Sequence, residues 1–239
     1  MGLEIDIVTL FPGFFAGPLQ ESILNRAQQE GHVKITLHNL RDFTHDKRRT
    51  VDDKPFGGGA GMLLKPEPIF ECIESLQAQK KSGRKKNKAS RTRGWVVSLD
   101  PHGEPLTQPL AKKLIRKKRL ILLAGHYEGI DHRVREHLVD QEISIGDFIT
   151  MGGEAPALCL IEAVTRLLPG VLGNSESLKH ESFQAGYLEY PQYTRPRDFR
   201  GWIVPPELVS GHHRAVEAWR HEAASKMTKA RRPDLLASK

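Results

Sequence analysis

The chain has 239 residues, enough for one large domain or for one domain with a small companion. Its formal net charge is +7 and its sequence pI is about 9.4. This charge favours a polyanionic partner, but a basic protein that binds no nucleic acid is an equally open interpretation. No apolar run approaches the ~20 residues that span a bilayer, so we expect no membrane partner. The N-terminus carries Glu4 and Asp6 and lacks the basic start of a signal peptide.

The cysteines are few. Cys72 and Cys159 each lie in an apolar helical pattern, so we expect them to be small buried residues and not part of a disulfide framework or a metal site. Such usage is typical of a reducing compartment, and we therefore expect a cytoplasmic protein.

Strand-like and helix-like segments alternate along the first two-thirds of the chain. Patterning of the β type marks Glu4–Leu10 and Val33–Leu37, and short apolar runs mark Trp95–Leu99 and Leu120–Ala124. Helical spacing predicts four helices, over Pro18–Glu30, Pro66–Gln79, Ala111–Lys118 and Ala157–Leu168. This alternation predicts right-handed βαβ units and an α/β fold with a parallel sheet that helices cover on both faces.

The composition changes after Pro169-Gly170. Gly173–Glu181 is polar and without periodicity, which is typical of a linker. Beyond it we expect an extended segment at Tyr190–Pro196 and a helix over Gly211–Met227. We therefore divide the chain into a large domain (1–172), a flexible linker (173–182) and a small, mainly helical domain (183–239).

One stretch is strongly basic. Lys80–Arg93 holds eight Lys and Arg residues and no acidic residue. One interpretation is a solvated insertion between a helix and a strand. The other is a contact with RNA phosphates, and the two are compatible.

A glycine cluster occupies Pro55–Met62 (PFGGGAGM). It is not a P-loop, which needs Gly-Lys followed by Ser or Thr, because this cluster runs into Met62-Leu63-Leu64. It also lacks the strand and helix that flank a dinucleotide-binding GxGxxG. Spacing alone leaves a structural turn and a ligand loop equally open.

Two segments follow strand-like runs at the positions where α/β proteins hold ligands. The first, Leu120–Asp131, is a buried strand that ends at Ala124 and continues into a turn beginning with Gly125. The second, Ser144–Pro156, has glycines bracketing apolar stretches, so its backbone can meet a purine edge. Ordinary turns are the other interpretation of both. A metal pair of His126 with His132 would lack a third ligand.

Arg166 lies in the otherwise apolar run Ala163–Leu168. A charged side chain in such a run usually has a partner or extends to solvent. An arginine near a helix end can also contact a ligand, so both interpretations stay open.

Taken together, these segments resemble the bacterial TrmD-type tRNA (guanine-N1)-methyltransferases of the trefoil-knotted SPOUT class. The matching motifs cover nearly the whole chain in order: LFPG (10–13), RDFT (41–44), TVDD (50–53), PFGGGAGM (55–62), GHYEGID (125–131), SIGDFITMGGEAPA (144–157), PGVLGN (169–174), YTRP (193–196), VPPELVSGHH (204–213) and RRPDL (231–235). Each motif alone is weak, but this many in register make the resemblance highly specific.

The resemblance implies a deep knot near the end of the large domain, whose loops hold S-adenosylmethionine in a bent shape. The implied donor residues are Leu99, Gly125, Tyr127, Glu128, Ser144, Ile145, Gly146, Asp147, Phe148, Ile149, Thr150, Gly152, Gly153 and Pro156. It also implies a homodimer, in which each active site is completed by the partner's C-terminal domain. The implied substrate is the guanosine immediately 3′ of the anticodon in tRNA, where another G precedes it.

Guanine N1 carries a proton, so its methylation needs a base, and negative charge grows on O6 as that proton leaves. Arg166 matches the family's catalytic arginine and is expected at O6. Glu181 stands where the family has the aspartate that serves as general base, which keeps the carboxylate and lengthens its side chain. Mg²⁺ is neither supported nor excluded by the sequence.

Two other functions are weighed against this one. A non-catalytic RNA-binding protein with the same fold predicts a spoiled donor pocket, yet Tyr127, Glu128 and the glycines are intact. A nucleotide hydrolase would need the phosphate cradle that the glycine cluster lacks. His126 and Gln192 depart from the residues of some family members, which bears on tRNA contacts.

Overall fold

The computed structural model describes residues 2–78, 93–174, 178, 181–184 and 186–237. The chain forms two compact units, Met1–Gly173 and Asn174–Lys239, and each is described by itself.

Unit 1 is built on a five-stranded sheet. Its strand order is β2-β1-β6-β5-β7, and all neighbouring strands are parallel. The strands are β1 (Leu3–Thr9), β2 (Val33–Asn39), β5 (Trp95–Pro105), β6 (Arg119–Ala124) and β7 (Gln141–Ser144). The parallel α/β sheet predicted from the alternating segments is therefore confirmed.

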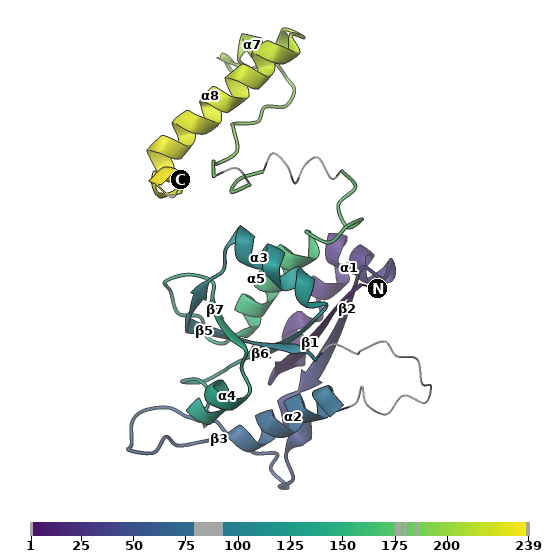
Figure 1. The fold of residues 1–239 in the computed structure, drawn as a ribbon, viewed down its shortest axis with the longest axis vertical. Coiled ribbons are helices and arrows are strands. Elements are labelled where there is room, and N and C mark those ends of the chain that lie inside the picture. The colour runs from purple at the N-terminus through teal and green to yellow at the C-terminus, as the bar shows by residue number, and fades with distance from the viewer. Residues whose placement is uncertain (1, 79–92, 175–177, 179–180, 185, 238–239) are drawn as a thin grey trace. The chain divides into compact units, whose positions relative to one another are not determined.

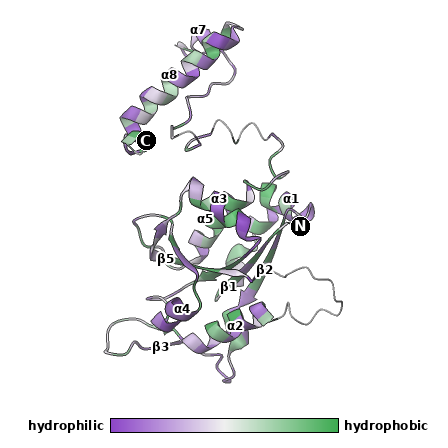
Figure 2. Cartoon of the chain, viewed as in Figure 1, coloured by the Kyte–Doolittle hydropathy of each residue, from purple (hydrophilic) through white to green (hydrophobic). Residues whose placement is uncertain are grey.

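Helices cover both faces of this sheet (Figure 1). On one face lie α1 (Ser22–Gln29), α3 (Gln108–Leu114) and α5 (Glu154–Thr165), and on the other lie α2 (Pro66–Ala78) and α4 (His132–His137). Each face has its own apolar core, one joining the sheet to α1, α3 and α5 and the other joining it to α2 and α4. Figure 2 shows hydrophobic residues in the strands and in α5, as this packing requires.

Three sequence expectations in this unit were wrong. The helix expected over Pro18–Glu30 is broken into η2 (Pro18–Gln20) and α1, because Glu21 is extended and Ser22 has a φ of 50°. Strand β7 was not expected, since its sequence QEIS has no continuous apolar run. Cys72 is buried as expected, but Cys159 is exposed on α5.

The chain makes shorter elements between the main ones. These are η1 (Pro12–Phe15), η3 (Leu40–Phe43), the antiparallel pair β3 (Asp52–Asp53) and β4 (Leu63–Leu64), and η5 (Ile115–Lys117), which extends α3. The Thr107 hydroxyl accepts from Leu110 N–H and caps α3, which starts three residues before the expected helix.

The elements with printed bounds in the described part of unit 2 are a short hairpin and helices: β8 (Asp198–Phe199), β9 (Trp202–Ile203), α7 (Pro206–Val209), α8 (His213–Arg231) and α9 (Asp234–Ala237). The buried Thr228 of α8 accepts a hydrogen bond from Leu188 N–H at 2.9 Å, which ties the preceding extended segment to the helix. Among the described residues of the whole chain, no helix is both long and apolar enough to cross a membrane.

Candidate functional site

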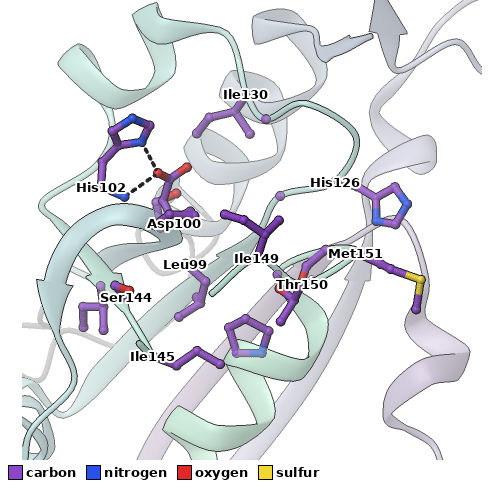
Figure 3. Close-up of a pocket in the computed structure, with 18 of the residues that line it drawn as sticks. Leu99, Asp100, His102, His126, Ile130, Ser144, Ile145, Ile149, Thr150 and Met151 are labelled. Atoms are coloured by element: carbon purple, nitrogen blue, oxygen red, sulfur yellow. Dashed lines mark hydrogen bonds and ion pairs between the residues drawn. The ribbon is translucent and has the colours of Figure 1, made fainter. Parts of the chain in front are cut away.

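A cavity of about 510 Å³ opens beyond the carboxyl ends of β5, β6 and β7. Its walls come from three stretches of chain that belong to those strands or follow them, within 98–102, 125–130 and 143–156, and from Arg135. Figure 3 shows Leu99, Ile145 and Ile149 directed toward one space, with Asp100 and His102 on one side and His126 and Met151 on the other. The cavity therefore lies where parallel α/β sheets bind ligands.

The structure gathers nearly all the residues expected to hold the methyl donor. All of them except Asp147 line this one cavity: Leu99, Gly125, Tyr127, Glu128, Ser144, Ile145, Gly146, Phe148, Ile149, Thr150, Gly152, Gly153 and Pro156. Segments that the sequence presented as two separate turns thus form one wall.

Glycines allow these two segments to cross in direct backbone contact. Gly153 N–H donates to Gly125 O at 2.7 Å, and His126 pairs with Gly152 in an antiparallel bridge. A Cβ on Gly153 would lie 2.8 Å from both Ala124 Cα and Gly125 N, which are backbone atoms that cannot move aside. A side chain at this position would therefore separate the two halves of the cavity wall.

The backbone at the cavity is also strained at one non-glycine residue. Tyr127 has a φ of 60°, in the left-handed region that costs such a residue about 1–3 kcal/mol. Its side chain remains partly exposed at the cavity, as do those of Phe148 and Ile149. The turn therefore presents aromatic and apolar groups to a ligand instead of burying them.

A charged group forms one side of the cavity. Asp100 accepts hydrogen bonds from His102 N–H and pairs with Arg135 of α4, which in turn donates to Glu142 at 3.1 Å. Burial raises the pKa of Asp100, but the hydrogen bonds from His102 and the adjacent Arg135 guanidinium outweigh it and hold the pKa below its usual value. Asp100 is therefore ionised at neutral pH, and the Arg135 guanidinium paired with it also lines the cavity and balances its charge.

Sequence reasoning did not identify Asp100, His102 or Arg135, because the expected strand ended at Leu99. In the structure β5 continues to Pro105 across an irregularity in its pairing with β7. The available signal was the position of Asp100-Pro101-His102 at a strand's carboxyl end, the rule that had already been applied to Gly125.

The two residues expected to act on guanine lie elsewhere. Arg166 follows the last residue of α5, ten residues after Pro156, which corresponds to about 15 Å along a helix axis. It is half-buried and does not line the cavity. Glu181 belongs to unit 2, where it is half-buried and accepts a hydrogen bond from Gln184 at 3.0 Å.

The glycine cluster of Pro55–Met62 packs against the first of the crossing segments. Glu128 N–H donates to Met62 O at 3.1 Å, and a Cβ on Gly61, whose φ is 80°, would collide with the Glu128 side chain. The cluster therefore positions Glu128, which lines the cavity, while the cluster itself does not.

The basic insertion of Lys80–Arg93 lies outside the described residues except for its last member. Arg93 pairs with Asp140 at 3.2 Å, just before β7.

The comparisons with known proteins agree with one another. A family model described as tRNA (Guanine-1)-methyltransferase TrmD matches residues 3–238. The chain is 53% identical over 234 residues to a tRNA (guanine-N(1)-)-methyltransferase of Microcystis aeruginosa, a match that covers 98% of this chain and 96% of that protein. It is 54% identical over 235 residues to the protein of the same name from Gloeobacter violaceus, covering 98% of each.

Proposed function

The chain belongs to the TrmD family of tRNA (guanine-1)-methyltransferases and methylates N1 of a guanine in tRNA, and we propose that its donor is S-adenosylmethionine and its target the guanosine immediately 3′ of the anticodon. The observation that carries the proposal is the cavity in which the two separate donor segments, 125–131 and 144–156, form one wall.

The cavity fits such a donor in size and in chemistry. Its volume of about 510 Å³ lies within the ~300–1,000 Å³ usual for small-molecule sites. Glycines bring backbone N–H and C=O groups close to a purine, and Tyr127, Phe148 and Ile149 supply apolar contacts. The anionic Asp100 and Glu128 suit a donor that carries a sulfonium and an ammonium group.

S-adenosylmethionine supplies an electrophilic methyl group, and this chain's residues handle the proton and the charge of guanine. Glu181 accepts the N1 proton as general base. Arg166 stabilises the negative charge that grows on O6. The methyl group forms its new bond to N1, while the electron pair of the broken C–S bond stays on sulfur, so the transfer itself needs in-line positioning.

The position of Arg166 supports a homodimer. Arg166 does not line the cavity of its own chain, and it lies about 15 Å along the helix axis from Pro156, which does. A second copy of the chain would bring its Arg166 and Glu181 to the cavity. In this arrangement each active site is shared and unit 2 binds tRNA. The linker expected at 173–182 lies partly outside the described residues.

A trefoil knot at the donor site is part of the same proposal. Gly153, which has no side chain, contacts the backbone of Gly125 where the segments 144–156 and 125–131 meet. This contact supports a threaded crossing of the two segments. A cytoplasmic location follows from the tRNA substrate.

Within the described ranges, no three His, Cys, Asp or Glu side chains come together in a way that would hold a metal ion. Mg²⁺ usually binds through one or two carboxylates together with substrate phosphates, so this finding leaves Mg²⁺ dependence open.

Calorimetry with the full-length protein tests the donor assignment against the two rival functions. We expect S-adenosylmethionine to bind and ATP not to bind. Binding of ATP alone would favour a nucleotide hydrolase, and tRNA binding without any donor binding would favour a non-catalytic RNA-binding protein.

A further inference from the structure

A cluster of four residues lies at the cavity wall. We define it as the Thr9 cluster: Thr9, Phe11, His126 and Glu154. The Thr9 hydroxyl donates to Glu154 Oε1 at 2.8 Å and accepts from Phe11 N–H at 2.9 Å. The ring centroids of Phe11 and His126 are 4.7 Å apart, and His126 Nδ1 lies 3.7 Å from Glu154 Oε2. The cluster joins the end of β1, the first residue of α5 and the turn after β6.

Glu154 is an unusual residue to bury. It is 4% exposed, and Thr9, 145 residues away in sequence, is 1% exposed. A buried carboxylate is costly unless it is hydrogen-bonded or placed in a favourable field. The Thr9 hydroxyl supplies the hydrogen bond, and the N-terminus of α5 supplies the positive end of a helix dipole. This carboxylate is thus fixed at one point between β1 and α5.

The cluster acts on the donor cavity through Gly152 and His126. Both line the cavity, whereas Thr9 and Glu154 do not. A Cβ on Gly152 would collide with Glu154 Oε2 and lie 2.5 Å from His126 Nδ1, so the Gly152 backbone fits closely between the two side chains. His126 Nδ1 is buried and has no hydrogen-bond partner among the described residues, and Glu154 Oε2 is the acceptor beside it.

We propose that Glu154 is a positioning residue for the methyl donor, acting with Thr9 to hold the His126 turn against Gly152 and so to fix the width of the cavity. The carboxylate touches neither donor nor guanine in this account. It sets the separation of the two segments before the donor arrives, which lowers the ordering needed on binding. The inference rests on the donor function proposed above.

The test compares isosteric changes of the Thr9 hydroxyl in the full-length protein. Thr9→Val removes the hydroxyl and keeps the shape, while Thr9→Ser keeps the hydroxyl. We expect Thr9→Val to weaken S-adenosylmethionine binding about tenfold in calorimetry, and Thr9→Ser to restore it to within about threefold of wild type. Glu154→Ala should match or exceed the loss in Thr9→Val. Glu162→Gln, an exposed carboxylate on the same helix, is the matched control.

Kinetics distinguish positioning from a general loss of structure. We expect Thr9→Val to raise the KM for the donor about tenfold while kcat at saturating donor stays within about twofold, the pattern of lost uniform binding. Equal KM in Thr9→Val and Thr9→Ser, or a loss of kcat with unchanged KM, would overturn the inference. If Glu154→Ala does not fold, the Thr9 pair decides alone. A wild-type protein that binds no S-adenosylmethionine would remove the proposed function together with this inference, whereas wild-type binding with equal variants would remove the inference only.

Discussion

At the scale of single residues, we propose that the acid–base chemistry depends on Glu181, which stands where the family resemblance implies a shorter aspartate. Glu181 lies in a described turn of unit 2 and its carboxylate accepts from Gln184. The longer side chain keeps the proton acceptor and moves it by about one methylene, a change that a side chain with rotatable bonds can absorb.

We therefore predict that Glu181→Gln slows methyl transfer about a hundredfold, because the amide cannot accept the N1 proton, whereas Glu181→Asp stays within about tenfold of wild type. Single-turnover methylation of tRNA with saturating donor measures this difference. Donor binding by calorimetry is the control and should be equal in the three proteins. Equal rates for all three would place the base on another residue.

At the scale of elements, the crossing of the two donor segments depends on one glycine. A Cβ at Gly153 meets backbone atoms at 2.8 Å, while one at Gly17 meets nothing within 4 Å. We predict that Gly153→Ala loses at least tenfold in donor affinity, or fails to fold, because the segments must separate. Gly17→Ala should resemble wild type in calorimetry and in thermal unfolding. Normal donor affinity in Gly153→Ala would show that the close crossing is not needed.

The sheet contains a buried charged group, the carboxylate of Asp6. Asp6 of β1 pairs with Arg119 of β6 at 2.7 Å and with His38 of β2 at 2.9 Å. Burial raises the pKa of Asp6, but the His38 hydrogen bond and the Arg119 guanidinium outweigh it, so the pKa lies below its usual value. Asp6 therefore contributes fully to the free energy of unfolding above its unfolded-state pKa of about 3.9. This contribution is lost as the pH falls through the folded-state pKa of Asp6.

We expect Asp6→Asn to lower the free energy of unfolding by about 2–3 kcal/mol at neutral pH, since Arg119 would keep its charge without its closest partner. The difference from wild type should shrink as the pH falls from about 5 toward 2. Urea titrations at several pH values measure it. A difference that stays constant across this range would show that Asp6 does not carry the pH dependence.

The residues of each element decide whether that element could be predicted from the sequence. Strands such as Leu120–Ala124 are continuous apolar runs, so sequence alone identified them. The break at Ser22 and strand β7 (QEIS) depend on tertiary packing and have no local signal. The donor residues were placed by resemblance. The Thr9–Glu154 hydrogen bond was not predictable, because it joins residues 145 apart whose spacing carries no period.

At the scale of the whole molecule, we propose that two copies of the chain form each active site. Arg166 stands at the end of α5 remote from Pro156, and Glu181 belongs to unit 2. A protein whose sites are shared in this way can be tested by mixing two inactive variants.

We predict that Arg166→Ala loses about a hundredfold or more in methyl transfer while still binding the donor, and that Gly152→Val loses donor binding. Heterodimers purified with one tag on each variant should regain activity from one of their two sites, where an intact cavity meets an intact Arg166. Sedimentation must first show that both parents are dimers. Heterodimers as inactive as both parents would place Arg166 in the cavity of its own chain.

Methylation of a tRNA transcript followed by nucleoside mapping tests the central claim most directly. With S-adenosylmethionine and a tRNA whose anticodon ends in G and is followed directly by a second G, we expect one new nucleoside, N1-methylguanosine, immediately 3′ of the anticodon. Replacing that guanosine by adenosine should abolish the product. Methylation at another position or ring atom, or tRNA binding with no methylation at all, would contradict the account.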